Sequence, residues 1–158
     1  MSRTTILLAT AALLLMLQTA HSEDITPAPQ VTNESATDDP RQLVAMPDNV
    51  RALMRSDMQN HLLAINEIIG YLADNNLDAA AEAAESKMGK STMGKHRATG
   101  KGPGMYMPLE MRDIGWGMHE SASEFAQLAK KGDLKAAYIA LQKVTTACVA
   151  CHYSYRTQ

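Results

Sequence analysis

Two cysteines and a histidine stand together in the stretch CVACH, residues 148–152 of this sequence. Cys148 and Cys151 are the only cysteines of the 158 residues, and His152 follows the second one directly. Three chemistries use such a stretch: a redox dithiol, half of a zinc site, and covalent attachment of haem. The other residues of the chain have to distinguish between them.

The spacing of the three side chains favours haem. On a helix, residues three and four apart share one side, so Cys148, Cys151 and His152 project in the same direction. Two thiols so placed can bond the vinyl groups of one haem while the imidazole reaches its iron, and C-x-x-C-H is the signature of that attachment. A zinc site needs two further ligands at motif spacing, and the sequence has no second C-x-x-C. A redox dithiol belongs at the start of a helix in a βαβ setting, and a disulfide across so short a loop would stabilise little.

The elements that must position this motif are predicted to be helices. Helical patterns run from Pro47 to residue 72, over residues 77–88, from Pro108 to residue 129, and from residue 134 through the motif, with Asp133 as an N-cap. The expected buried seams are Met54, Met58, Ile65, Ile68 and Leu72, then Met111, Ile114, Met118, Phe125 and Leu128, then Leu134, Tyr138, Leu141, Thr145, Cys148, His152 and Tyr155. Short connections at 72–77 and 130–133 favour antiparallel neighbours. The predicted fold is therefore all-α: an antiparallel four-helix bundle with haem attached near the C-terminus of the last helix.

The first 22 residues have the features of a cleavable signal peptide. Arg3 gives a positive start, an apolar run extends from Ile6 to Leu17, and Ala20-His21-Ser22 places small residues at the −3 and −1 positions. The apolar run is too short to span a bilayer comfortably, so a retained membrane anchor is the less favoured alternative. We expect export without stable membrane insertion, which in a bacterium leads to the periplasm.

Residues 23–46 differ in composition from the rest of the mature chain. The stretch EDITPAPQVTNESATDDP, residues 23–40, is rich in Pro, Thr and Asp and nearly free of large apolar groups, so it cannot bury enough surface to offset the entropy of ordering. We therefore predict a flexible linker over 23–46 and a single four-helix-bundle domain over 47–158. The formal net charge of −2 gives no reason to expect a nucleic-acid partner.

The motif in its helical setting resembles the class II c-type cytochromes, which comprise cytochrome c-prime and its low-spin relatives. The resemblance covers Pro47 to Arg156, and its specific part is the stretch VTTACVACHYSYR. It implies one covalently bound haem c, with thioethers from Cys148 and Cys151 and with His152 as the proximal iron ligand. Arg156 matches the position of an arginine that commonly approaches a haem propionate, and guanidinium groups pair well with carboxylates. Relatives of this class often form homodimers.

The resemblance leaves the other face of the iron to be assigned. Members with an apolar residue from the first helix at that face are five-coordinate and bind small gases, whereas low-spin members place a methionine there and carry electrons. Met58 stands at the matching turn of the first predicted helix, and we expect it to be the sixth ligand. His61, about 60° around the helix from Met58, is the alternative ligand. Met54 is a weaker one, and an open site that binds NO or CO is the third reading.

The expected function is that of a monohaem electron carrier and not of an enzyme, because no catalytic acid, base or nucleophile constellation stands out. The segment 87–101 is basic, with Lys87, Lys90, Lys95, Arg97 and Lys101 and no acidic residue among them. Complementary charge raises encounter rates between proteins. An acidic redox partner is therefore expected to dock at this segment.

Copper binding is the hypothesis from a different functional class. Thioether and imidazole groups together suit copper(I), and the chain has 11 methionines, with His96 and His119 outside the motif. Met111 and Met118 stand on the third seam, where methionine serves as an adaptable core residue. His119 points about 100° away from Met118 on a helix. We therefore expect no tight copper site at these residues.

Overall fold

The structure is a computed structural model, and it describes residues 39–96, 100 and 102–157. Most of these residues are helical, which confirms the predicted all-α class at the level of secondary structure. The helices are α1 (Asp48–Ala73), α2 (Leu77–Met88), α3 (Leu109–Lys130) and α4 (Leu134–Ser154), with the 3-10 helices η1 (Lys90–Thr92) and η3 (Pro103–Met105) between α2 and α3. The short strands β1 (Gln42–Leu43) and β2 (Tyr155–Arg156) flank the helices in sequence.

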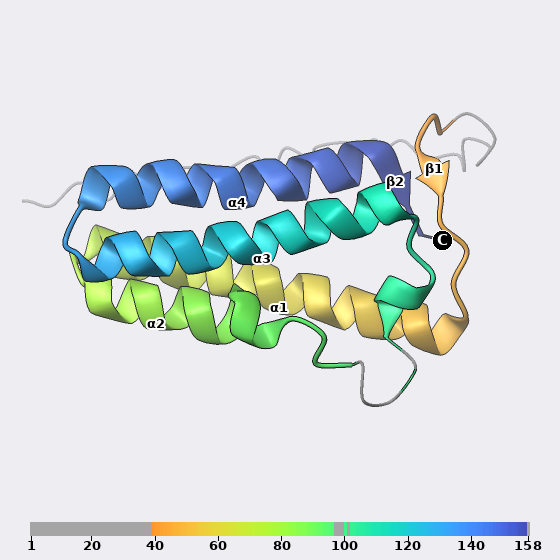
Figure 1. Cartoon of the computed structure of the whole chain (residues 1–158), viewed down its shortest axis with the longest axis horizontal. Coiled ribbons are helices and arrows are strands. Elements are labelled where there is room, and N and C mark those ends of the chain that lie inside the picture. The colour runs from red at the N-terminus through yellow and green to blue at the C-terminus, as the bar shows by residue number, and fades with distance from the viewer. Residues whose placement is uncertain (1–38, 97–99, 101, 158) are drawn as a thin grey trace, which may run out of the picture. The chain divides into compact units, whose positions relative to one another are not determined.

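The helices pack in chain order, α1 on α2, α2 on α3 and α3 on α4. Figure 1 shows the turns after α1 and α3 at one end of the molecule, with η3 and both strands at the other end. The segment 89–108, which includes both 3-10 helices, leads from α2 to the start of α3. The end of α4 and the beginnings of α1 and α3 consequently lie at the same end of the molecule (Figure 1).

Local sequence signals fix both tight turns. The side chain of Asn76 accepts a hydrogen bond from the amide of Ala79 at the start of α2. The side chain of Asp133 accepts one from the amide of Ala136 at 2.9 Å, which confirms its prediction as an N-cap. Gly132 has φ of +77°, a conformation that glycine adopts without the strain that a Cβ would bring.

Small side chains dominate the core between the helices. Ala80, Ala81, Ala83 and Ala84 are the buried residues of α2 along with Met88, so the neighbouring helices can approach α2 closely. Phe125 of α3 and Ile68 of α1 are the largest of the fully buried side chains. None of the helices in the described part of the chain is long and apolar enough to cross a membrane.

The seam of α4 differs from its prediction. Leu134, Tyr138 and His152 are exposed, whereas the predicted Leu141 is buried together with Ala137, Ala140 and Val144. The helix is therefore rotated toward its small residues, because alanine allows α4 to lie close to α3. Tyr155, predicted on the same helical face, lies in β2 after the helix has ended at Ser154.

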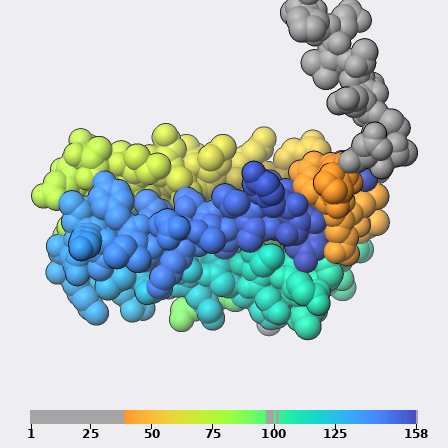
Figure 2. All heavy atoms as spheres, turned by 90° about the horizontal axis from the view of Figure 1, so that it is seen from above, coloured from red at the N-terminus to blue at the C-terminus, as the bar shows by residue number. Residues whose placement is uncertain are grey.

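The boundary between linker and domain also needs correction. The predicted signal peptide and residues 23–38 lie outside the described residues, but residues 39–46 of the predicted linker belong to the same compact unit as the helices. β1 pairs in parallel with β2, and the amide of Val44 donates to the carbonyl oxygen of Arg156 at 2.8 Å. Figure 2 shows this segment, in orange, against the end of α4. Val44, only 4% exposed, supplies the apolar anchor that the compositional argument overlooked.

Candidate functional site

The last two turns of α4 carry the C-x-x-C-H motif. Cys148 and Cys151 are free thiols and are half-buried, and Cys148 packs against the core while its Sγ donates to the carbonyl oxygen of Val144. Burial raises the pKa of both thiols above its ordinary value, and the neighbouring Cys148 raises that of Cys151 further. Redox-active dithiols have lowered thiol pKa values, so the surroundings of this pair are not those of a redox dithiol.

A small pocket of about 220 Å³ lies where α1 meets the end of α4. Its lining residues are Met54, Arg55, Met58, Cys151, His152, Arg156 and Thr157. The structure thus brings together the predicted proximal ligand His152, the predicted sixth ligand Met58 and the predicted propionate partner Arg156. Cys148 stands one turn behind on α4 and is not among the lining residues. His61 does not line this pocket either.

Arg156, which lines this pocket, has an acidic neighbour. Its Nε lies 3.7 Å from Oδ2 of Asp39, which also accepts a hydrogen bond from Nη2 of Arg41 at 2.6 Å. The Arg41 side chain is the main cause that lowers the pKa of Asp39 to about 2. A carboxylate therefore already lies next to the guanidinium of Arg156.

A larger cavity of about 680 Å³ adjoins the small pocket. It is lined by α1, by the segments 92–96 and 102–107, and by α3, and its residues are Met54, Asp57, Met58, His61, Thr92, Met93, Gly94, Lys95, His96, Gly102, Pro103, Gly104, Met105, Met107, Arg112, Gly115, Trp116, Met118 and His119. Met54 and Met58 line both spaces, so the two adjoin along α1. The volume lies within the range of about 300–1,000 Å³ that is usual for small-molecule sites.

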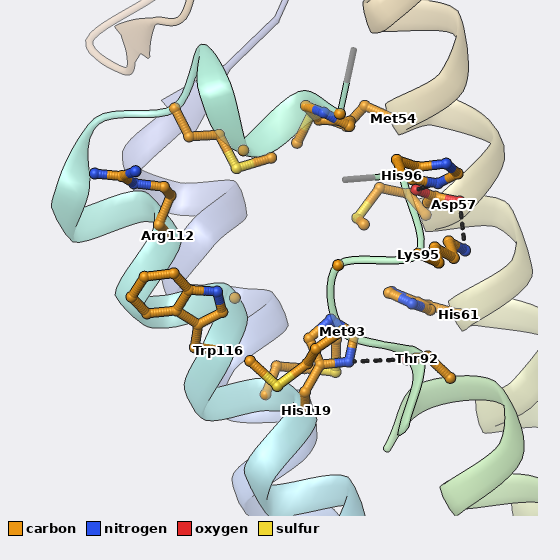
Figure 3. A pocket seen from close by; sticks show the side chains of 18 of the residues that line it. Met54, Asp57, His61, Thr92, Met93, Lys95, His96, Arg112, Trp116 and His119 are labelled. Carbon is orange, nitrogen blue, oxygen red and sulfur yellow. Dashed lines mark hydrogen bonds and ion pairs between the residues drawn. The ribbon is translucent and has the colours of Figure 1, made fainter. Parts of the chain in front are cut away.

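Two histidines face each other across this cavity (Figure 3). The ring centroids of His61 from α1 and His119 from α3 are 5.7 Å apart, with the rings nearly perpendicular. Nδ1 of His119 donates to the carbonyl oxygen of Met88 at 2.7 Å and lies 3.3 Å from the hydroxyl of Thr92. Burial, followed by His119 and Lys95, lowers the pKa of His61 to about 4, so its imidazole is neutral near pH 7.

Charged groups line the cavity beside the histidines. Asp57 of α1 forms an ion pair with Nζ of Lys95 at 2.7 Å, and its other oxygen lies 2.9 Å from Nε2 of His96. Nε of Arg112 is buried without a hydrogen-bond partner in the described part of the chain, and its guanidinium lies 5.9 Å from the centre of the Trp116 ring. The cavity is therefore lined by charged groups on both its α1 side and its α3 side, together with several methionines.

The basic segment 87–101 is partly neutralised by α1. Lys87 pairs with Glu67, and Lys95 pairs with Asp57. Lys90 is exposed, whereas Arg97 and Lys101 lie outside the described residues. The segment itself contains no acidic residue. The acidic residues that pair with its lysines lie on α1, some 20 to 40 positions earlier in the sequence.

Sequence reasoning missed this larger cavity as a site. Met118 and His119 were expected to point apart, yet both line it, because the cavity extends around a broad face of α3. Met93, Met105 and Met107 reach it from the segment between α2 and α3, where no helical period marks them. Within residues 39–96 and 102–157, no group of three or more His, Cys, Asp or Glu side chains is placed to hold a metal ion. The sequence feature that could have indicated this cavity was the high methionine content near His96 and His119.

No family model matches this chain, and neither a curated protein nor a solved structure matches it. The side chains around the two adjoining spaces must therefore carry the functional conclusion.

Proposed function

We propose that this protein is a periplasmic monohaem c-type cytochrome that carries electrons, built as an antiparallel four-helix bundle. The observation that carries the proposal is the small pocket, in which Met58 of α1 and His152 of α4 share a lining with Cys151. A thioether and an imidazole from two different helices, next to an attachment cysteine, form the donor set of a low-spin c-type haem.

The residues around the pocket fit haem c in their chemistry. The thiols of Cys148 and Cys151 would each add across a vinyl group, sulfur to one carbon and hydrogen to the other, which consumes no oxidant or reductant. The raised pKa values keep both thiols protonated near neutral pH. The small pocket alone is below the usual size of a ligand site, and it shares Met54 and Met58 with the larger cavity.

Each remaining side chain of the pocket has a role in holding the group. His152 and Met58 would hold the haem iron, and this pair of ligand types tends to raise the reduction potential. Arg156 would exchange its present neighbour Asp39, 3.7 Å away, for a propionate carboxylate. Bound haem would supply the one-electron redox chemistry, while the protein provides ligands, orientation and exclusion of water. The chain is not proposed to be an enzyme.

The position of His61 favours Met58 as the sixth ligand. Met58 lines both spaces, whereas His61 lines only the larger cavity, where it faces His119. The alternative function, a five-coordinate protein that binds NO or CO, requires that Met58 leave this face of the iron open. The half-buried Met58 side chain stands in the pocket with His152, which supports the electron carrier instead.

We propose that an acidic redox partner docks near the basic segment 87–101. Lys90 is exposed there, while Lys87 and Lys95 are engaged by acids of α1. Complementary charges at a rim act mainly on the association rate, so electron transfer to such a partner should slow as salt is added. A homodimer remains a prediction from the resemblance.

The visible spectrum of the haem-loaded protein tests the function. With Met58 as ligand, the oxidised protein should be low-spin with a weak sulfur-to-iron band in the far red, and the reduced protein should take up little CO. Met58→Ala should abolish the band and permit CO binding. Met54→Ala is the matched control, since Met54 lines the same two spaces and should leave the band in place.

Two outcomes would contradict this assignment. A high-spin spectrum with ready CO uptake in the unaltered protein would identify a gas-binding protein. A band that survives Met58→Ala and disappears in His61→Ala would make His61 the ligand.

A further inference from the structure

The facing histidines of the larger cavity are spaced like two ligands of one ion. Histidine nitrogens bind metals at about 2.0–2.1 Å, so two imidazoles on one ion have ring centroids roughly 5 to 6 Å apart. The centroids of His61 and His119 are 5.7 Å apart, although the rings belong to helices that are distant in sequence. Figure 3 shows the two rings approaching each other from opposite walls.

The hydrogen bond of His119 leaves the correct nitrogen for a ligand. A carbonyl oxygen only accepts hydrogen bonds, so the contact between Nδ1 of His119 and the carbonyl of Met88 at 2.7 Å places the proton on Nδ1. Nε2 then keeps its lone pair. Metal-binding histidines usually donate their other ring nitrogen to a carbonyl or carboxylate in this way, which fixes both tautomer and ring orientation.

The other donors near this pair are thioethers. Met118 precedes His119 on α3, and Met93 comes from the segment that follows η1, and both line the cavity with the two histidines. Thioether sulfur is a soft ligand that selects copper(I) over zinc and over hard cations. Lys95, which is paired with Asp57, and Arg112 also line this cavity. The positive charge of Arg112 disfavours a divalent ion more than a monovalent one.

We propose that His61 and His119, with the thioethers of Met93 and Met118, form a copper(I) site separate from the haem pocket. His61 and His119 do not line the small pocket that holds His152, so the two sites use different ligands. The sequence-based expectation that no tight copper site exists here was based on Met118 and His119 of a single helix. The second histidine comes from α1, and the third wall comes from the segment between α2 and α3.

The experiment titrates haem-loaded protein with copper(I) under reducing, anaerobic conditions against a coloured copper(I) chelator, while the haem spectrum is recorded. We expect one equivalent to bind without a change in the haem bands. His61→Gln and His119→Gln should each weaken binding roughly 10- to 100-fold. His96→Gln is the matched control, because His96 lines the same cavity but its Nε2 lies on Asp57, and it should keep the affinity of the unaltered protein.

The readouts separate this proposal from the haem assignment. Zinc(II) in equal amount should not displace copper(I), since the thioethers prefer the softer ion. Weak, non-stoichiometric uptake that neither His61→Gln nor His119→Gln alters would overturn the copper site and leave the cytochrome proposal standing. A change of the haem bands in His61→Gln would also overturn it, since His61 would then belong to the iron. Loss of binding in His96→Gln would contradict the stated ligand set.

Discussion

Ser123 of α3 is the one buried polar side chain of the described residues, and removing its hydroxyl should measurably destabilise the protein. The hydroxyl accepts a hydrogen bond from the amide of Lys90 at 2.9 Å and donates one to Oε2 of Glu85. It therefore connects the end of α2 and the start of η1 to α3. Thr92 is the last residue of η1 and Met93 follows it, and both residues line the larger cavity.

The magnitude can be worked out from these two contacts. A buried donor that loses its partner costs about 1–3 kcal/mol, while the replacement of serine by alanine inside a helix returns up to about 0.7 kcal/mol of helix propensity. Ser123→Ala should therefore lower the free energy of unfolding by about 1–2 kcal/mol. Urea unfolding of the haem-loaded protein, followed by circular dichroism near pH 7, measures this difference.

Ser86→Ala is the matched control for Ser123→Ala. The exposed Ser86 hydroxyl bonds only to the carbonyl of Glu82, one turn earlier on the same helix, so its loss should change stability by less than about 0.5 kcal/mol. A second readout is Glu85, whose pKa is lowered chiefly by the hydroxyl of Ser123. That pKa should rise toward its ordinary value in Ser123→Ala. Equal stabilities of the Ser123→Ala and Ser86→Ala proteins would refute the reasoning.

Two further predictions concern acid stability and the domain boundary. The pKa of His61 is about 4 in the folded protein against an ordinary 6.5, so the unfolded chain binds the proton more readily and the free energy of unfolding falls as pH drops through that window. His61→Gln should reduce this acid-induced loss of unfolding free energy by about 1–2 kcal/mol, a figure that allows for solvent screening of the partly exposed ring. If the free energy of unfolding depends equally on pH with and without His61, this prediction is wrong. A chain that begins at residue 47 should be less stable by about 1.5–3 kcal/mol than one that begins at Asp39, because it lacks β1 and the buried Val44. Equal melting temperatures of the two shortened chains would show that residues 39–46 contribute nothing.

The helices could be predicted because their signals are local. Asp133 caps α4 through a hydrogen bond to an amide three residues later, and the apolar spacing of Ile68, Met118 and Phe125 reports the face that each helix buries. The rotation of α4 could not be predicted in the same way. Two of its four buried residues are alanines, which hydropathy ranks below the exposed Leu134, and α4 also leaves Tyr138 exposed. Which face of α4 is buried depends on how closely α4 approaches α3. The spacing of residues within one helix does not specify the distance between two helices.

The site was predictable only where its residues share one motif or one helix. Cys148, Cys151 and His152 are neighbours in sequence, and the position of Met58 came from the resemblance. The pairing of His61 with His119 joins residues 58 positions apart, and the contact of Arg156 with Asp39 joins two segments that bracket the whole fold. Such contacts depend on how the helices pack, which the spacing of residues within one helix does not specify.

The covalent attachment of haem is the central claim, and the intact mass of the mature protein tests it most directly. The protein would be expressed with a working c-type maturation system, extracted with acid and acetone to remove haem held without covalent bonds, and weighed by mass spectrometry. We expect the mass of the chain without residues 1–22 plus one haem, with Cys148→Ala and Cys151→Ala together abolishing the addition. Mature protein that carries no haem mass, with both thiols still free to react, would contradict the account.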